Sequence, residues 1–219
     1  MVSIFSQTYK DELVVIPKKI FSIWLNESSE LPELVKRCIG SQQIPGYEYN
    51  LITLDNCFKD HPYIQQALNS PYEINKWCKL SDFLRMEYLI RGYGIYLDSD
   101  VEILKDKNFN HLLDSEMFVG TELDPNTENT GSWIASSVVA SEENHPFVKK
   151  WMAEVVANFR GDDDKNFESS MEILTRLYYT WNILHPKEMP IYPPEYFQPY
   201  NHFTQTVQIT NKTITYHYF

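Results

Sequence analysis

The sequence is an acidic chain of 219 residues with 43% hydrophobic residues and a formal net charge of -11 at pH 7. A chain of this length and apolar content can bury one substantial core, so we expect a single domain over residues 1–219. The negative charge disfavours a partner bound mainly through phosphates or anionic lipid headgroups, and we predict no nucleic-acid binding. If such a protein handles a diphosphate, it needs positive charge locally, from a cation or a few basic residues.

The cysteine content and the apolar runs indicate where in the cell the protein resides. The 3 cysteines are too few for a disulfide framework and form no C-x-x-C pair. The first residues show no basic leader followed by a long apolar stretch, and no apolar run approaches the roughly 18 residues that a bilayer span needs. We therefore expect no transmembrane segment and a cytoplasmic protein, at most peripheral at the inner membrane face.

The first half of the chain alternates between strand and helix patterns. Residues 19–25 (KIFSIWL) are rich in β-branched and aromatic residues and predict a strand, as do residues 47–54 (YEYNLITL). Between them, residues 30–41 carry apolar side chains at helical spacing. Two further helices are expected over residues 60–69 and 81–91, and Gly92 ends the second.

The second half continues this alternation. Residues 94–101 (GIYLDSDV) predict an apolar strand that leads into two carboxylates, and strands are also expected over 118–123 and 132–141. Helices are expected over 145–159 and 168–184, with a short acidic loop (161–166) between them and a turn at 210–212 near the end. The pattern predicts an α/β fold with a mainly parallel central sheet flanked by helices, in which ligands bind beyond the carboxyl ends of the strands.

Asp98 and Asp100 stand one residue apart at such a strand end. Two carboxylates in this position can place oxygen atoms around one hard divalent cation, Mn²⁺ or Mg²⁺. A D-x-D triplet alone is a weak signal, because Asp is common in solvated turns. The apolar strand that precedes the pair favours the metal site over an idle turn.

Asp82 and Arg85 lie three residues apart on the preceding predicted helix and therefore share one face. On an isolated helix, such a pair is most often an ordinary surface ion pair. Next to an acidic strand end, the guanidinium fork of Arg85 can instead bind a diphosphate, and Asp82 can accept hydrogen bonds from sugar hydroxyls.

Three segments carry a resemblance to a known family. IPKKIFSIWL, KLSDFLRMEYLIRGYGIYLDSDVEIL and IYPPEYFQPY resemble glycosyltransferase family 32, the glycosyltransferases with a DXD-containing sugar-binding region. The middle segment is the specific part, because S-D-x-x-R, G-x-G-I-Y and L-D-x-D-V follow the order and spacing of that family. The resemblance covers most of the chain.

This resemblance implies a nucleotide-binding fold of the GT-A type, a bound Mn²⁺ or Mg²⁺, and transfer of a hexose with retention of anomeric configuration. The implied donor is a nucleotide diphosphate sugar, which we expect to be UDP-linked. The implied acceptor is a saccharide or a lipid-linked saccharide, in the synthesis of a bacterial cell-surface polysaccharide.

The resemblance also implies roles for single residues. The implied catalytic residues are Asp82, Arg85, Asp98 and Asp100; the implied donor-binding residues are Trp24, Asp82, Arg85, Tyr96, Asp98, Ser136 and His217. Trp24 matches the position that stacks on the nucleotide base. Asp100 is implied as the direct metal ligand, with Asp98 beside it. Ser136 stands where many family members have Asn, and the sequence ends in TYHYF where the family usually has a His-rich strand and Ser-Trp.

Two alternatives from other classes remain open. A phosphohydrolase of the haloacid-dehalogenase type also ends a strand in D-x-D, and would use Asp98 as nucleophile and Asp100 as acid and base. The late position of the motif in the chain and Glu102 after it count against this reading. The second alternative is a nucleotide-sugar binder without catalytic activity.

Overall fold

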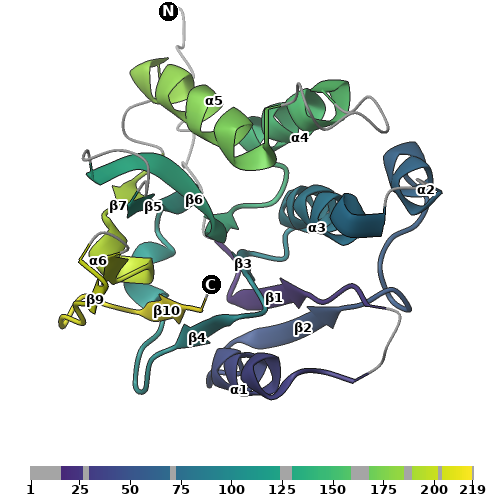
Figure 1. The fold of residues 1–219 in the computed structure, drawn as a ribbon. Coiled ribbons are helices and arrows are strands. Elements are labelled where there is room, and N and C mark those ends of the chain that lie inside the picture. Colours follow the sequence, from purple (N-terminus) through teal and green to yellow (C-terminus); the bar gives the residue numbers. More distant parts are fainter. Residues whose placement is uncertain are drawn as a thin grey trace, which may run out of the picture.

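The computed structural model describes residues 16–26, 30–69, 73–123, 130–158, 168–184, 189–201 and 204–218. Its centre is a six-stranded sheet in the order β2-β1-β3-β6-β5-β7 (Figure 1). The strands are β1 (Lys19–Ile23), β2 (Glu48–Ile52), β3 (Ile95–Leu97), β5 (Met117–Leu123), β6 (Thr130–Ser141) and β7 (Ile191–Tyr192). β1 pairs in parallel with β2 and β3, and β5 with β7, whereas β6 runs antiparallel to both its neighbours. The predicted α/β class with a mainly parallel sheet is confirmed.

Two short antiparallel sheets lie beside the central one. β4 (Val101–Ile103) pairs with β10 (Thr215–His217), and β8 (Tyr200–Asn201) pairs with β9 (Thr206–Val207). In the first of these, His217 lies opposite Val101. The β4–β10 pair therefore brings the C-terminal segment next to the residues that follow the acidic pair.

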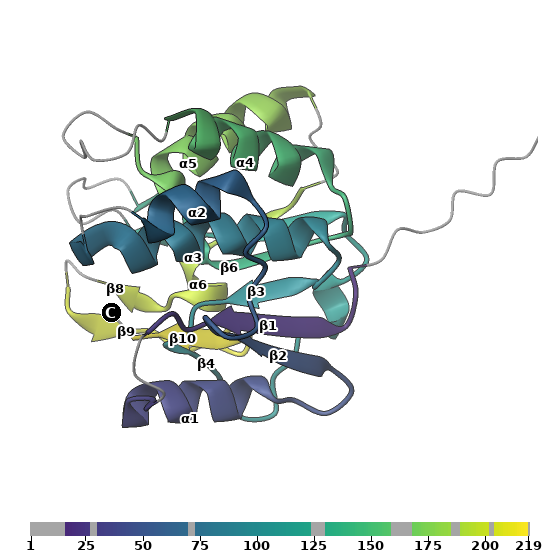
Figure 2. The same ribbon diagram turned by 90° about the vertical axis from the view of Figure 1, so that its right-hand side faces the viewer.

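Helices cover both faces of the sheet. The helices are α1 (Glu33–Gln42), α2 (Pro62–Leu68), α3 (Glu73–Ile90), α4 (Pro146–Asn158), α5 (Ser170–Leu184), α6 (Pro194–Phe197) and the 3-10 helix η1 (Asn110–Leu112). α2 to α5 lie over one face, and α1 lies beneath the other (Figure 2). The predicted helices 30–41, 60–69, 145–159 and 168–184 thus correspond to α1, α2, α4 and α5. The predicted acidic loop 161–166 lies outside the described residues.

The alternation of side chains along the central strands divides the core in two. On β3, Tyr96 packs into the core beneath α2 to α5, whereas Ile95 and Leu97 pack into the core on the opposite face. On β1, Phe21 and Ile23 join the first core and Ile20 joins the second. The direction of each side chain near the strand ends follows from this alternation.

Two of the predicted elements differ from the sequence-based expectation, and the short elements η1, β7, α6, β8, β9 and β10 are not predicted at all. α3 begins at Glu73 rather than Ser81, because a serine is tolerated inside a helix and does not mark its start here. The predicted strand over residues 94–101 is divided: β3 ends at Leu97, a turn follows, and β4 begins at Val101 in another sheet. Asp98 and Asp100 therefore belong to a tight turn between two strands.

Gly94 fixes the start of β3. Its φ is +75°, and a Cβ atom at this position would lie 2.4 Å from the carbonyl oxygen of Pro17. Only glycine combines this left-handed conformation with so close an approach of two backbone segments. The close pairing of β3 with β1 depends on this contact. The position of the acidic turn that follows β3 therefore depends on it too.

Candidate active site

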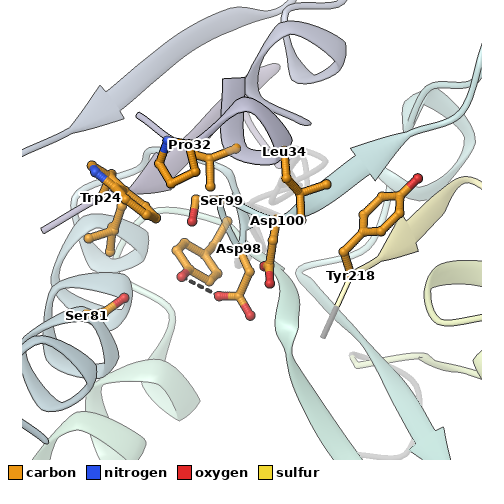
Figure 3. A pocket seen from close by; sticks show the side chains of 11 residues that line it. Trp24, Pro32, Leu34, Ser81, Asp98, Ser99, Asp100 and Tyr218 are labelled. Carbon is orange, nitrogen blue, oxygen red and sulfur yellow. Dashed lines mark hydrogen bonds between the residues drawn. The ribbon is translucent and has the colours of Figure 1, made fainter. Parts of the chain in front are cut away.

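A pocket of about 350 Å³ opens beyond the carboxyl ends of β1 and β3 (Figure 3). It is lined by Ile23, Trp24, Pro32, Leu34, Val35, Ser81, Tyr96, Asp98, Ser99, Asp100 and Tyr218. One wall is apolar and the other carries the acidic turn. This is the position at which open α/β sheets bind their ligands.

Asp98 and Asp100 meet His217 at this pocket. Nε2 of His217 lies 3.3 Å from Oδ1 of Asp100 and 3.8 Å from Oδ2 of Asp98. One ligand atom from each of the three residues falls within 4.8 Å of the others. Burial lowers the pKa of His217, but the hydrogen bond to Asp100 and the charges of Asp98 and Asp100 outweigh burial and raise it. Two carboxylates and one imidazole form a donor set that fits Mn²⁺, and less closely Mg²⁺, which prefers oxygen alone.

Arg85 of α3 lies on the other side of Asp98. Its Nη2 is 3.2 Å from Oδ1 of Asp98, 3.3 Å from the hydroxyl of Tyr96 and 3.4 Å from Oδ1 of Asp82. The guanidinium also lies over the Tyr96 ring, 4.3 Å from its centroid. The predicted pair of Asp82 and Arg85 is thus joined to the acidic turn through Asp98, and it is not a surface ion pair.

The hydrogen-bonding capacity of Arg85 is only partly used. Arg85 is 4% exposed, and its Nε and Nη1 make no hydrogen bond to any residue that the structure describes. Burial lowers the pKa of Arg85, but Tyr96, Asp98 and Asp82 together raise this pKa by more than burial lowers it. The guanidinium therefore stays cationic. A buried guanidinium with two unused nitrogen atoms is suited to an anionic ligand or ordered water.

Tyr96 and Asp82 respond to the same surroundings. Burial raises the pKa of Tyr96, so its hydroxyl keeps the proton that it donates to Oδ1 of Asp98 at 2.5 Å. Burial also raises the pKa of Asp82 to about 6, with Asp98 adding to this effect and Arg85 opposing it, although 31% of the Asp82 side chain remains exposed. The site thus combines one fixed cation with carboxylates that repel one another.

The backbone of the acidic turn is anchored by residues that the sequence did not single out. Gln42, the last residue of α1, and Ser22 of β1 hydrogen-bond to backbone carbonyl oxygens of this segment. Gln42 is followed by Gln43, which is exposed. Only the structure distinguishes the two, because both stand at the end of the predicted helix with the same chemistry.

The two remaining predicted residues lie near the turn. Trp24 follows β1 and lines the pocket, and its buried Nε1 has no hydrogen-bond partner among the described residues. Ser136 lies on β6, outside the lining of this pocket, next to Ser137, whose carbonyl accepts the Asp98 N–H at 2.9 Å. The structure therefore gathers the predicted residues at one strand end, with Ser136 at the margin.

The family of capsular polysaccharide synthesis proteins matches residues 3–168 of the chain. The chain belongs to this family. The matched span contains each predicted site residue except His217, which the β4–β10 pair brings to the site from outside it. No curated protein matches the chain.

Two solved structures of glycosyltransferases share the fold of this capsular polysaccharide synthesis protein. The PaToxG glycosyltransferase is 19% identical, with a TM-score of 0.52 over 76% of this chain and 70% of that chain. A glycosyltransferase involved in the glycosylation of the major capsid of PBCV-1 is 9% identical, with a TM-score of 0.51 over 91% of this chain and 94% of that chain. The family and this fold together support a glycosyltransferase, as the sequence predicts, and favour neither alternative.

Among the helices of the described residues, none is both long enough and apolar enough to cross a bilayer.

Proposed function

We propose that this capsular polysaccharide synthesis protein is a metal-dependent glycosyltransferase that transfers a hexose from a UDP-sugar to a saccharide acceptor. The observation that carries the proposal is the convergence of Asp98, Asp100 and His217 beside Arg85, next to the pocket that Asp98 and Asp100 line. These residues come from the β3–β4 turn, the C-terminal strand and α3. The β4–β10 pairing places His217 beside the turn, and Arg85 contacts the turn through Asp98, so three segments of the chain present a cation and three potential metal ligands at one place.

The donor set supports a divalent cation as cofactor. Asp98, Asp100 and His217 would hold Mn²⁺ or Mg²⁺, and the cation would supply positive charge to the diphosphate of the donor when bound. The chain adds its own cation, because Arg85 stays charged beside Asp98 and has two buried nitrogen atoms without a described partner. Charge grows on the departing diphosphate during glycosyl transfer, so donors placed there in advance lower the barrier.

The apolar wall of the pocket suits the nucleoside. Trp24 and Pro32 offer flat surfaces for a base, and Leu34 and Val35 complete this wall beside the acidic turn. The resemblance to glycosyltransferase family 32 supports a uridine nucleotide, retention of anomeric configuration and a lipid-linked saccharide as acceptor. These finer assignments rest on that resemblance.

The experiment is an assay of donor hydrolysis and transfer with a panel of nucleotide sugars, in Mn²⁺ and in chelator. We expect UDP-hexose turnover that depends on the metal. Asp98→Asn and Asp100→Asn should each lower kcat/KM by about 100-fold or more, since each removes charge from the cation site. Both variants should retain the wild-type circular dichroism, because the two side chains serve the pocket and not the core.

Asp114→Asn is the matched control. Asp114 is exposed and lies outside the pocket, so the same chemical change there should leave turnover unchanged. Metal-dependent turnover that persists at the wild-type rate in both Asp98→Asn and Asp100→Asn would refute the proposed role of the acidic turn. Saturable donor binding without turnover for any acceptor or nucleotide sugar would instead indicate a non-catalytic binder.

A further inference from the structure

We infer that Gln42 is a positioning residue. It sets the metal affinity of the acidic turn by donating hydrogen bonds to the backbone carbonyl oxygens of that turn. This inference rests on the proposed function and adds a residue of the site that neither the motif nor the family match identifies. Gln42 is the last residue of α1, and none of its surface is exposed. It does not line the pocket, so it acts on the turn and not on the ligand.

The side-chain amide of Gln42 spans the turn. Its Nε2 donates to the carbonyl oxygen of Asp98 at 3.0 Å and to that of Val101 at 2.7 Å. Since two carbonyl oxygens can only accept, both must face the NH₂ group, and the orientation of the amide is fixed by its partners. The two acceptors are the first and last residues of the turn that carries both acidic side chains.

Ser22 completes the arrangement from β1. Phe21 and Ile23 face the core under α2 to α5, so Ser22 between them faces α1. Its Oγ lies 2.5 Å from Oε1 of Gln42 and 2.7 Å from the carbonyl oxygen of Leu97. The single hydroxyl proton can serve either acceptor. Ser22 thus links the Gln42 amide to the last residue of β3.

The other backbone groups of the turn are also held. The N–H of Val101 donates to the carbonyl oxygen of Asp98 at 3.0 Å, so this oxygen accepts two hydrogen bonds. The N–H of Asp98 donates to Ser137, and the carbonyl oxygen of Asp100 accepts from Tyr218 at 3.1 Å. Within this frame, Gln42 ties the two ends of the turn together, and so fixes how far the carboxylates of Asp98 and Asp100 stand apart.

The consequence for a metal follows from geometry. A cation held by two carboxylates needs both in place before it binds, and partners that orient the ligands typically change metal affinity by about 10- to 100-fold. Without the Gln42 amide, the carbonyl oxygen of Val101 loses this buried donor and the turn can open. The hydrophobic core around position 42 would stay packed, because the substituted side chain is apolar.

The test measures Mn²⁺ binding directly on the full chain, by the electron paramagnetic resonance signal of free Mn²⁺, without donor or turnover. Gln42→Met keeps the length of the side chain and removes both donors. We expect it to fold and to bind Mn²⁺ about 10- to 100-fold more weakly than wild type. In turnover assays, the Mn²⁺ concentration for half-maximal rate should rise by a similar factor.

Two controls separate positioning from general damage. Gln43→Met makes the same change at the exposed neighbour and should leave the Mn²⁺ affinity unchanged. Trp151→Phe removes a different buried hydrogen bond, from Nε1 to the carbonyl oxygen of Ser170 at 3.1 Å, which joins α4 to α5 and does not involve the turn. It should lower the melting temperature without changing Mn²⁺ affinity. If Gln42→Met does not fold, Ser22→Ala provides the test, and it should weaken Mn²⁺ binding in the same direction.

The outcomes distinguish this inference from the proposed function. Wild-type affinity for Mn²⁺ in folded Gln42→Met, or in Ser22→Ala if that variant must replace it, would overturn the positioning role and leave the metal site intact. A wild-type protein that binds no Mn²⁺ at all would overturn the proposed metal dependence itself.

Discussion

Arg85 shows what one buried charge contributes to this site. Its guanidinium is almost fully buried, contacts Asp82, Tyr96 and Asp98 through Nη2, and has two further nitrogen atoms without a described partner. A planar fork can serve these neighbours and a diphosphate at once, whereas an ammonium is a single point of charge. The identity of the cation should therefore matter as much as its presence.

We predict that Arg85→Lys keeps the fold but lowers kcat/KM for the donor by about 100-fold, the cost typical of losing a donor that serves developing charge. Steady-state kinetics with the preferred nucleotide sugar will measure this loss. Arg176→Lys is the control, since Arg176 is 46% exposed and pairs with Glu168 at the surface. Equal activity of Arg85→Lys and wild type would show that the fork plays no part in donor binding or turnover.

At this scale, the sequence predicts some residues of the site and misses others for a physical reason. Asp98 and Asp100 are identified because charge at the end of an apolar strand is unusual, and Asp82 and Arg85 because they share one face of the helix before that strand. Gln42 and Ser22 carry no such signal, because an uncharged polar side chain becomes informative only when its burial and partners are known.

At the scale of elements, a buried histidine, His145, immediately precedes α4. Nδ1 of His145 accepts the N–H of Phe147 at 3.2 Å and so caps the first turn of the helix. The side chain is 2% exposed, and burial lowers its pKa to about 4. In the unfolded chain, the same group takes up a proton near its ordinary pKa of about 6.5. Between these two values the unfolded state binds more protons, so stability falls as pH drops.

We predict that wild type loses about 2 kcal/mol more stability than His145→Asn between pH 7.5 and pH 5. Asparagine keeps an oxygen that can accept the Phe147 N–H but does not titrate in this range. Urea unfolding at both pH values will measure the difference. Identical pH dependence in the two proteins would mean that His145 is not held neutral in the folded state.

The elements themselves show how far local patterns reach. Helices and strands with clear periodicity are predicted close to their observed bounds, because their apolar faces are local in sequence. The break between β3 and β4 is not, since the pairing of β4 with β10 joins segments more than a hundred residues apart (Figure 1). The place of His217 beside Asp100 is a product of that pairing and cannot be derived from periodicity.

At the scale of the whole molecule, an acidic protein gathers two carboxylates and a histidine at one end of its sheet. Its formal net charge of -11 would repel a diphosphate unless positive charge is concentrated locally. Arg85 supplies one such charge, and the metal proposed at Asp98, Asp100 and His217 supplies the other. We therefore expect donor binding to require a cation at this position.

The most direct test is a crystal structure of the full chain with Mn²⁺ and UDP, with diffraction data collected at a wavelength where manganese scatters anomalously. We expect one anomalous peak between the side chains of Asp98, Asp100 and His217, with the diphosphate between this peak and Arg85. Bound UDP without a metal peak at that position, at saturating Mn²⁺, or a metal peak at another site, would contradict it.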